Sequence, residues 1–279
     1  MKKKWKWSTF FLLLFFFVGL SVMLYPSISN YWNSKTQSEA IVDYEKMLAA
    51  IPKEDYDKMF KAAEDYNKEL ASLDFPFLEY DQLQGYYDIL DLTGTGMMGY
   101  ITIDAIGLEL PIYHGTAENV LSVAVGHLEG SSIPVGGEGT HAALSAHRGL
   151  PTATLFTNLD KLELGDTFQI TILDRVLTYQ VDQIRIVNPD DASDLVISQE
   201  DDYCTLLTCT PYGINTHRLL VRGKRIETIE EKNLYIKTDA YKIDSLIVTP
   251  IVALPILFTL MIIVLSKPVK KDDLGDELE

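Results

Sequence analysis

Two long apolar segments without a charged residue lie near the two ends of this 279-residue chain, and they constrain its architecture more than any other feature. The first covers residues 8–25 and the second covers residues 246–265. An α-helix rises about 1.5 Å per residue, so 20 residues span roughly 30 Å, the thickness of the hydrocarbon core of a bilayer. We therefore predict two membrane-spanning helices. The alternative for each segment is a helix buried in the core of a soluble protein.

Lysines flank both segments on the side that faces the chain end. Positively charged flanks remain in the cytoplasm, so residues 1–7 and 266–279 are predicted to be cytoplasmic tails, with an extracellular region between the spans. Residues 8–25 are a transmembrane span or signal anchor, or else a cleaved signal peptide with Ser27-Ile28-Ser29 as its cleavage site. In either case the second segment anchors the exported part. The flanking lysines are Lys2, Lys3, Lys4 and Lys6 at one end and Lys267, Lys270 and Lys271 at the other.

Acidic residues outnumber basic residues by 40 to 24, which gives a formal net charge of -16. Such a chain lacks the basic face that phosphate binding needs, so we expect no nucleic-acid partner. A hydrophobic content of 47% argues against a disordered acidic chain. We interpret the acidic residues as a solvated surface that keeps the exported part soluble. A basic partner is the alternative.

Residues 26–97 are predicted to form a helical extension that includes a candidate lid. The pattern is helical over residues 38–72, and after Pro52 apolar side chains recur at spacings of three and four, which forms a stripe for packing. Pro52 followed by acidic residues is a favourable helix start. Residues 73–97 contain the turn-rich sequence Thr93-Gly94-Thr95-Gly96 and are predicted to be an irregular surface connection.

From Met98 onward the pattern becomes that of β-strands. Apolar and polar residues alternate, and a change of phase within one run predicts a β-bulge. Short strands with glycine-rich turns and few helices indicate a mainly β domain, either a small closed barrel or a sandwich. We place this domain at residues 98–227 and a linker at residues 228–245. The predicted strands include residues 168–172, 177–186, 203–209 and 217–225.

The chain has two cysteines, Cys204 and Cys209, on one predicted strand. Exported domains often use cysteines in disulfides. Because successive strand residues point to opposite faces, an odd spacing of five directs these two side chains apart, and a disulfide between them has poor geometry. We therefore predict that one of them is a free thiol kept for chemistry.

Cys209 closes one predicted strand and Arg218 opens the next. If the two strands form a hairpin, the guanidinium lies near the sulfur. A permanent cation at that place favours a thiolate or stabilises a developing oxyanion. The alternative is a buried structural cysteine and a surface arginine, which the spacing alone favours.

His147 is the candidate base among five histidines, because it follows an apolar strand-like run and lies at a turn. The spacing favours it only weakly over the others. No CxxC or HExxH spacing occurs, so we expect no metal site and no cofactor. No G-x-S-x-G elbow supports a serine hydrolase. The other four histidines are His114, His127, His141 and His217.

Several segments together resemble the motifs of sortases, specifically of the class C branch that assembles pili. Residues 205–223, TLLTCTPYGINTHRLLVRG, resemble the nucleophile segment of that family. Residues 140–151, THAALSAHRGLP, resemble its histidine segment. The matching segments follow the family's order over residues 99–227, and the C-terminal apolar span is similar to this class as well. Further matches are LPIYHGT at 110–116, GHLEG at 126–130 and PVGG at 134–137.

The resemblance implies an eight-stranded sortase-type β-barrel and a cysteine transpeptidase in the membrane of a Gram-positive bacterium, with its catalytic domain outside the cell. It implies Cys209 as the nucleophile, His147 as the acid and base, and Arg218 as the cation that holds the oxyanion or the substrate. Cys204 lies outside the motif and is expected to pack in the core. The implied partners are pilins that carry a Leu-Pro-x-Thr-Gly-like sorting signal and an acceptor lysine.

One departure from the class C pattern concerns the lid, which in that class carries an Asp-Pro-aromatic tripeptide. The nearest sequence here is Asp74-Phe75-Pro76-Phe77, with one residue inserted after the aspartate, so Asp74, Pro76 and Phe77 are the candidate lid residues. The lid is altered, or it is absent and the site is open. We predict that the Cys209 thiol is more accessible than in lidded relatives.

Two other functions stay open. The first is a sortase that anchors proteins to an amine of the cell-wall peptide. It stays open because the sequence of the enzyme does not identify the acceptor amine. The second is a catalytically silent adhesion or scaffold module, against which the presence of Cys209, His147 and Arg218 argues. The sorting motif and the substrate-binding residues are not defined by the sequence.

Overall fold

The computed structural model describes residues 7–228 and, near the other end, residues 253, 255–259 and 262, which are helical. The chain divides into two units, one of residues 29–233 and one of residues 1–28 and 234–279. Some of the predicted segments fall largely outside the described residues: the cytoplasmic tails at 1–7 and 266–279, the linker at 228–245 and the span at 246–265.

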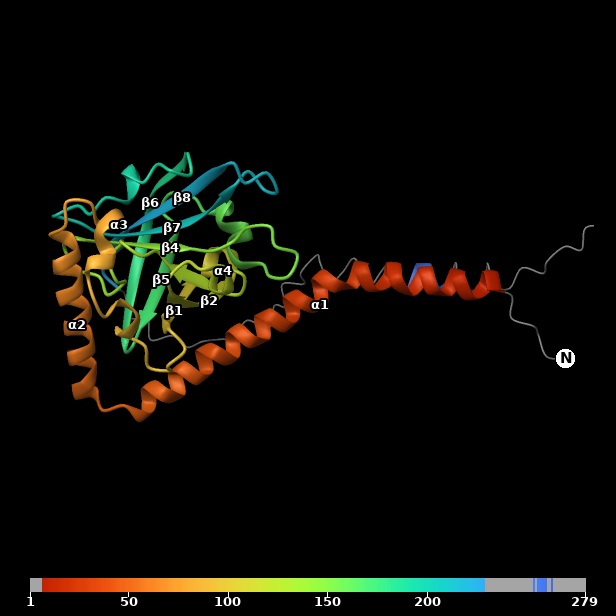
Figure 1. Cartoon of the computed structure of the whole chain (residues 1–279), viewed down its shortest axis with the longest axis horizontal. Helices are drawn as coiled ribbons and strands as arrows, with labels where there is room; N and C mark the ends of the chain where they lie inside the picture. Colours follow the sequence, from red (N-terminus) through yellow and green to blue (C-terminus); the bar gives the residue numbers. More distant parts are fainter. Residues whose placement is uncertain (1–6, 229–252, 254, 260–261, 263–279) are drawn as a thin grey trace, which may run out of the picture. The chain divides into compact units, whose positions relative to one another are not determined.

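Helix α1 (Trp7–Ala50) contains the first apolar segment. Within the described residues it is the one helix that is long and apolar enough, by length and composition over Leu13–Ala50, to cross a membrane. This finding is compatible with the span or anchor predicted at residues 8–25. The helix continues through Pro26, so the apolar segment and the first part of the helical extension are one element (Figure 1).

The helical pattern expected over residues 38–72 is present as parts of two helices. The first ends at Ala50, and α2 (Lys53–Ala71) begins after Pro52. Pro52 has no backbone N–H to donate and disfavours helical geometry at the residue before it, which favours a helix end before Ile51. The predicted helix start at Pro52 is confirmed, since Pro52 caps α2 in an extended conformation.

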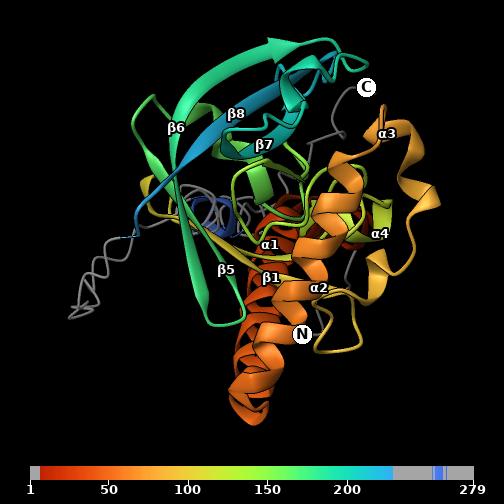
Figure 2. The same ribbon diagram turned by 90° about the vertical axis from the view of Figure 1, so that its left-hand side faces the viewer.

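Helix α2 packs the predicted apolar stripe against the barrel, as Figure 2 shows for the two elements. Asn67 lies within the stripe and is buried, and it forms two hydrogen bonds with the backbone of Ile133. Its Nδ2 donates to the Ile133 carbonyl at 3.0 Å, and its Oδ1 accepts from the Ile133 N–H at 2.7 Å. A buried amide with both ends satisfied fixes the position of α2 on the barrel. The apolar stripe residues that are buried are Tyr56, Phe60, Ala63 and Leu70.

Eight strands close into a barrel in the order β1-β2-β3-β4-β7-β8-β6-β5 (Figure 1). The mainly β, eight-stranded closed barrel is therefore confirmed. Most neighbouring strands are antiparallel, whereas β2 with β3 and β4 with β7 are parallel. The strands are β1 (Met97–Ile103), β2 (Leu108–His114), β3 (Val125–His127), β4 (Thr140–Ser145), β5 (Thr167–Ile172), β6 (Arg175–Val187), β7 (Asp202–Thr210) and β8 (His217–Ile226).

The barrel interior is filled by side chains that alternate along each strand. Phe168 and Tyr179 stack inside it with their ring centroids 5.5 Å apart. Gly223 on β8 allows this stack, because a Cβ at that position would lie 2.6 Å from the Phe168 ring. The predicted bulge in the sixth strand is confirmed between Val181 and Gln183.

Tyr44 joins the end of α1 to the barrel wall. Its side chain is fully buried, and its hydroxyl donates to the Met98 carbonyl at 3.0 Å and accepts from the Leu173 N–H at 2.9 Å. Both bonds satisfy backbone groups at the ends of barrel strands. The shorter elements are α3 (Pro76–Glu79), η1 (Tyr80–Gln82), η2 (Tyr86–Asp88), η3 (Asp104–Ile106), α4 (Glu118–Leu121), η4 (Leu155–Lys161) and η5 (Ser193–Leu195).

Candidate active site

The hairpin of β7 and β8 places Cys209 directly opposite Arg218. Residues that face each other in an antiparallel pair project from the same side of the sheet, so the thiol and the guanidinium share one face. The hairpin that the sequence suggested is confirmed by this register. The loop between the strands begins at Pro211, whose carbonyl accepts hydrogen bonds from the Ile214 and Asn215 N–H groups.

The parallel pairing of β4 with β7 brings His147 to the same end of the barrel. Ser145 is aligned with Leu207. Beyond the last paired residue, the Ala146 N–H donates to the Leu207 carbonyl at 3.2 Å, and the Thr208 hydroxyl donates to the Ala146 carbonyl at 2.8 Å. His147 and Cys209 each lie two residues beyond this last aligned pair, at the same end of the two strands. The three residues named from the sequence therefore lie at the same end of three adjacent strands, β4, β7 and β8.

His147 has a carboxylate partner that the sequence did not reveal. Its Nε2 lies 3.3 Å from Oε2 of Glu118 on α4, and the imidazole is 28% exposed. The backbone carbonyl of His147 accepts a hydrogen bond from the Phe156 N–H at 3.1 Å. Because the Glu118 side chain is 80% exposed, we expect the contact to orient the ring rather than to stabilise the fold. Glu118 lies 29 positions earlier on another element, so no spacing motif indicated it.

The two cysteines occupy opposite environments, as the odd spacing predicted, and both thiols are free. Cys204 is 0% exposed, and burial, together with the charge of Asp202, raises the pKa of its thiol. A buried neutral thiol is unreactive. Cys209 is partly exposed at the end of β7, so of the two thiols it is the one that stays available for chemistry.

Arg218 is the one arginine of the chain without a carboxylate within ion-pair distance among the described residues. Its Nη1 donates only to the neighbouring His217 carbonyl, at 3.3 Å. A cation without a counter-ion is available to meet negative charge that develops on a bound substrate. The other five arginines all form ion pairs: Arg148 with Asp160, Arg175 with Glu64, Arg185 with Asp194, Arg222 with Asp182 and Arg225 with Asp202.

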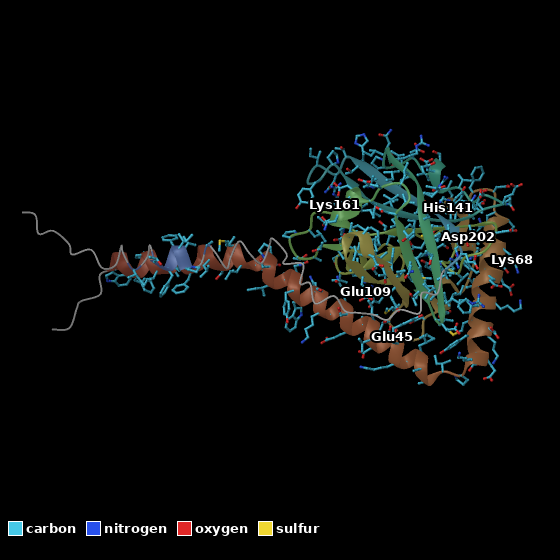
Figure 3. The ribbon with its side chains drawn as sticks, turned by 180° about the vertical axis from the view of Figure 1, so that it is seen from behind. Glu45, Lys68, Glu109, His141, Lys161 and Asp202 are labelled. Carbon is cyan, nitrogen blue, oxygen red and sulfur yellow. The ribbon has the colours of Figure 1, made fainter. Side chains whose placement is uncertain are left out.

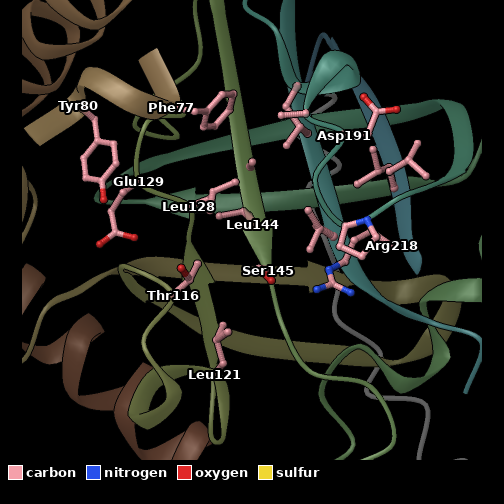
Figure 4. Close-up of a pocket in the computed structure, with 17 residues that line it drawn as sticks. Phe77, Tyr80, Thr116, Leu121, Leu128, Glu129, Leu144, Ser145, Asp191 and Arg218 are labelled. Atoms are coloured by element: carbon pink, nitrogen blue, oxygen red, sulfur yellow. The ribbon is translucent and has the colours of Figure 1, made fainter. Parts of the chain in front are cut away.

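A pocket of ≈ 530 Å³ leads along the sheet to this cluster. Figure 4 shows Arg218 at one side, Phe77 and Tyr80 at the other, and the β4 residues between them. Leu207 lines the pocket from β7, and Cys209 follows two residues later on the same face. Cys209 and His147 do not themselves line the pocket, whereas Arg218, which is paired with Cys209, does. Its apolar lining includes Leu121, Leu128, Leu144, Leu207 and Leu220.

The candidate lid is present as α3 and packs on the barrel. Pro76 occupies the first turn of this helix, and the Glu79 carboxylate accepts from the Phe75 N–H at 3.0 Å. A Cβ at Gly130 would lie 2.8 Å from the Phe77 Cα, so α3 lies directly against the β3–β4 connection. Phe77 lines the same pocket as Arg218, whereas Asp74 is exposed.

The accessibility of the Cys209 thiol stays a prediction, and Phe77→Ala tests it. If the thiol is open, this variant changes the rate of Cys209 alkylation by iodoacetamide by less than about two-fold, because no side chain shields the sulfur. Phe75→Ala is the matched control, since Phe75 is 64% exposed and does not line the pocket. A ten-fold faster reaction in Phe77→Ala alone contradicts the prediction. Deletion of residues 73–95 would test the same point less cleanly, because it also removes Tyr86 and Leu90, which are buried in the core.

Three of the other histidines are buried and held neutral, which separates them from His147. Burial lowers the pKa of His114 and of His141, and it lowers the pKa of His127 to about 4. His127 donates from Nε2 to the Ser132 carbonyl at 2.8 Å and accepts at Nδ1 from the Tyr86 hydroxyl at 2.8 Å. His141, labelled in Figure 3, is the second residue of β4, at the opposite end of the strand from His147. His217 is exposed.

The buried histidines predict that stability falls on mild acidification. Their pKa values are lower in the folded chain, so the unfolded chain binds more protons below about pH 6.5, and the free energy of unfolding falls as the pH falls toward 4. For His127 alone we expect a loss of about 2 kcal/mol between pH 7 and pH 5. Urea unfolding at the two pH values checks this, with His127→Gln to isolate the effect and His217→Asn as the control. Equal pH dependence in wild type and His127→Gln contradicts it.

Within the described residues, no group of three or more His, Cys, Asp or Glu side chains is placed to hold a metal ion. The candidate site therefore consists of a partly exposed thiol, an imidazole with a carboxylate partner and a guanidinium without a counter-ion. Such a set supports acyl transfer through a covalent thioester.

The proteins that this chain resembles in sequence and in structure are sortases. Residues 101–226 match the Sortase domain family. The crystal structure of sortase C1 from Streptococcus agalactiae is 48% identical, with a TM-score of 0.62 over 68% of this chain and 99% of that chain. The Streptococcus pneumoniae sortase C structure is 45% identical, with a TM-score of 0.62 over 68% of this chain and 97% of that chain.

A more distant relative is sortase D of Bacillus subtilis (strain 168), with 33% identity over 131 residues, or 46% of this chain. The match spans 63% of sortase D, slightly less than two thirds of that protein. The barrel topology, the matched family and the solved relatives all agree with the resemblance seen in the sequence. The chain belongs to the sortase family of cysteine transpeptidases, in its class C branch.

Proposed function

We propose that this protein is a membrane-anchored class C sortase that joins pilin subunits on the outside of a Gram-positive cell. The observation that carries the proposal is the pairing of Cys209 with Arg218 across one hairpin, with His147 just beyond the end of the neighbouring strand β4. The pilin substrate is supported by the class C relatives, among them the S. pneumoniae sortase C, whose structure concerns pilin substrate specificity. The apolar first half of α1 supports the anchor.

In the proposed first step, the Cys209 thiolate attacks the threonine carbonyl carbon of a Leu-Pro-x-Thr-Gly-like signal. The carbonyl oxygen takes the negative charge, and the unpaired Arg218 guanidinium donates hydrogen bonds to it. The Thr–Gly bond then breaks, and protonated His147 gives its proton to the departing glycine amine. The products are a threonyl thioester on Cys209 and a free glycine amine.

In the proposed second step, a neutral lysine amine of another pilin attacks the thioester carbonyl. Neutral His147 accepts the proton that the nitrogen loses, and the Cys209 thiolate leaves. The new bond is an isopeptide bond between threonine and lysine, and the enzyme returns to its starting protonation state. No cofactor enters this cycle.

The acceptor distinguishes pilin assembly from cell-wall anchoring. We expect the full chain, in detergent micelles with a Leu-Pro-x-Thr-Gly peptide, to form an isopeptide product with a lysine-containing pilin peptide about ten-fold faster than with a cell-wall-type peptide amine. Mass spectrometry of the two products measures the ratio. The same pilin peptide with its lysine acetylated is the control.

Two outcomes contradict this assignment. A faster reaction with the cell-wall-type amine means that the protein is an anchoring sortase. Absence of cleavage with either acceptor, in a chain that is folded, supports the silent scaffold instead. The pocket beside Arg218 argues against the silent scaffold, because it offers a substrate a cavity lined by both apolar and polar side chains.

A further inference from the structure

Arg148, the residue after His147, has a side chain that is only 9% exposed. Two nitrogen atoms of its guanidinium form hydrogen bonds. Nη2 donates to the Asp160 carboxylate on η4, and Nη1 donates to the Thr210 hydroxyl at 3.3 Å. The guanidinium carbon also lies 5.9 Å from the centre of the Tyr212 ring. Burying an unpaired charge costs free energy, so the ion pair with Asp160 compensates the burial of the Arg148 guanidinium.

These contacts join three segments that are distant in the sequence. Thr210 is the residue after Cys209, and Asp160 lies in η4. Two further hydrogen bonds join η4 to the loop of residues 147–149. The Phe156 N–H donates to the His147 carbonyl, and the Gly149 N–H donates to the Thr157 hydroxyl at 3.1 Å. Arg148 is thus the side chain that connects this loop and η4 to the end of β7.

The contacts of Tyr212 reinforce the same junction. A Cβ at Gly149 would lie 3.1 Å from the Tyr212 ring, so the ring packs closely on the loop that follows His147. Gly149 has a φ of +78°, which a residue with a side chain adopts only with strain. The loop therefore approaches the β7–β8 connection as closely as its backbone allows.

We propose that Arg148 is a positioning residue for the transfer reaction: it fastens the loop that carries His147 to the strand end that carries Cys209. This inference rests on the proposed function. Proton transfer requires the imidazole to stay within hydrogen-bond reach of the reacting atoms, and small displacements of a catalytic group reduce the rate strongly. Arg148 acts through His147 rather than by binding the substrate, because its Nη1 and Nη2 donate to Thr210 and Asp160 and its remaining donor, Nε, is buried without a partner.

The first test is Arg148→Lys, which keeps the positive charge but lacks the planar fork that reaches two partners at once. We expect kcat for sorting-peptide cleavage to fall about ten-fold or more, with KM within two-fold of wild type, since substrate contacts stay intact. Arg222→Lys is the matched control, because Arg222 forms a bidentate pair with Asp182 on β6, opposite Thr205 rather than Cys209. The control is expected to keep wild-type kcat.

The second test needs no sorting peptide. The rate of Cys209 alkylation by iodoacetamide is measured against pH in wild type, Arg148→Lys, Arg222→Lys and His147→Ala. The charged groups around this strand end are His147 with its partner Glu118, Arg218, and the pair of Arg148 with Asp160. Lysine at position 148 keeps the charge there, so a changed profile reports a displaced imidazole. We expect Arg148→Lys to move toward the His147→Ala profile and Arg222→Lys to match wild type.

The outcomes separate the inference from the proposed function. If wild type cleaves no peptide but the alkylation profiles shift as expected, the proposed function fails and the positioning role stands. If wild type cleaves the peptide while Arg148→Lys has unchanged kcat and an unchanged profile, the positioning role is wrong. Equal losses in Arg148→Lys and Arg222→Lys, or identical profiles in wild type and His147→Ala, also overturn it.

Discussion

Cys209→Ala is expected to abolish sorting-peptide cleavage, with a loss of roughly 10⁴-fold or more, because covalent catalysis has no substitute for the missing sulfur. Release of the glycine-containing fragment, followed by chromatography, measures the loss. The side chain is partly exposed at the end of β7, so its removal leaves no large cavity and the variant is expected to fold.

Cys204→Ala is the matched control for this prediction. Cys204 is fully buried beside the barrel core, and its removal costs about 1 kcal/mol of stability through the lost packing. Cleavage is expected to stay near the wild-type rate, since this thiol cannot reach a substrate. Cleavage that survives in Cys209→Ala, or that is lost in a folded Cys204→Ala, contradicts the assignment of the nucleophile.

Arg218→Ala is expected to lower kcat for cleavage by about 10²- to 10³-fold, the loss seen when one donor to a developing oxyanion is removed. Arg218→Lys restores part of the rate, because an ammonium supplies charge but not the planar pair of donors. Arg218 has no carboxylate partner, so its removal leaves no buried unpaired acid. The free energy of unfolding is therefore expected to change by less than about 1 kcal/mol.

The control for Arg218 is Arg185→Ala on β6, whose exposed side chain pairs with Asp194. It is expected to keep the wild-type kcat. A fall of less than three-fold in Arg218→Ala would show that the guanidinium does not meet the transition state. A loss that parallels the fraction of unfolded protein would assign it a structural role instead.

The barrel and the reactive hairpin were predictable because their signals are local. Alternating residues define the strands, and the positions of Cys209 and Arg218 at the two ends of one turn bring them together in any tight hairpin. The free thiol followed from the odd spacing of Cys204 and Cys209. The choice of His147 needed the family motif, because its position beside Cys209 depends on the parallel pairing of β4 with β7.

Other features depended on contacts that no sequence pattern encodes. Glu118 and Asp160 approach the site from separate short helices, and nothing in their neighbourhoods marks them as partners of His147 and Arg148. The break between α1 and α2 illustrates a different limit, since Pro52 marked the start of α2 but no signal marked the end of α1 at Ala50. The candidate lid also formed a helix where an irregular connection was expected.

The most direct test of the account is the intact mass of the full chain in detergent micelles after incubation with a Leu-Pro-x-Thr-Gly peptide. The account predicts a mass increase equal to the peptide acyl fragment, located on Cys209, absent from Cys209→Ala and removed by a lysine-containing acceptor. A folded wild-type chain that gains no adduct while the peptide is consumed would contradict it, because cleavage would then proceed without a thioester. An adduct on Cys204 or on a lysine would contradict it as well.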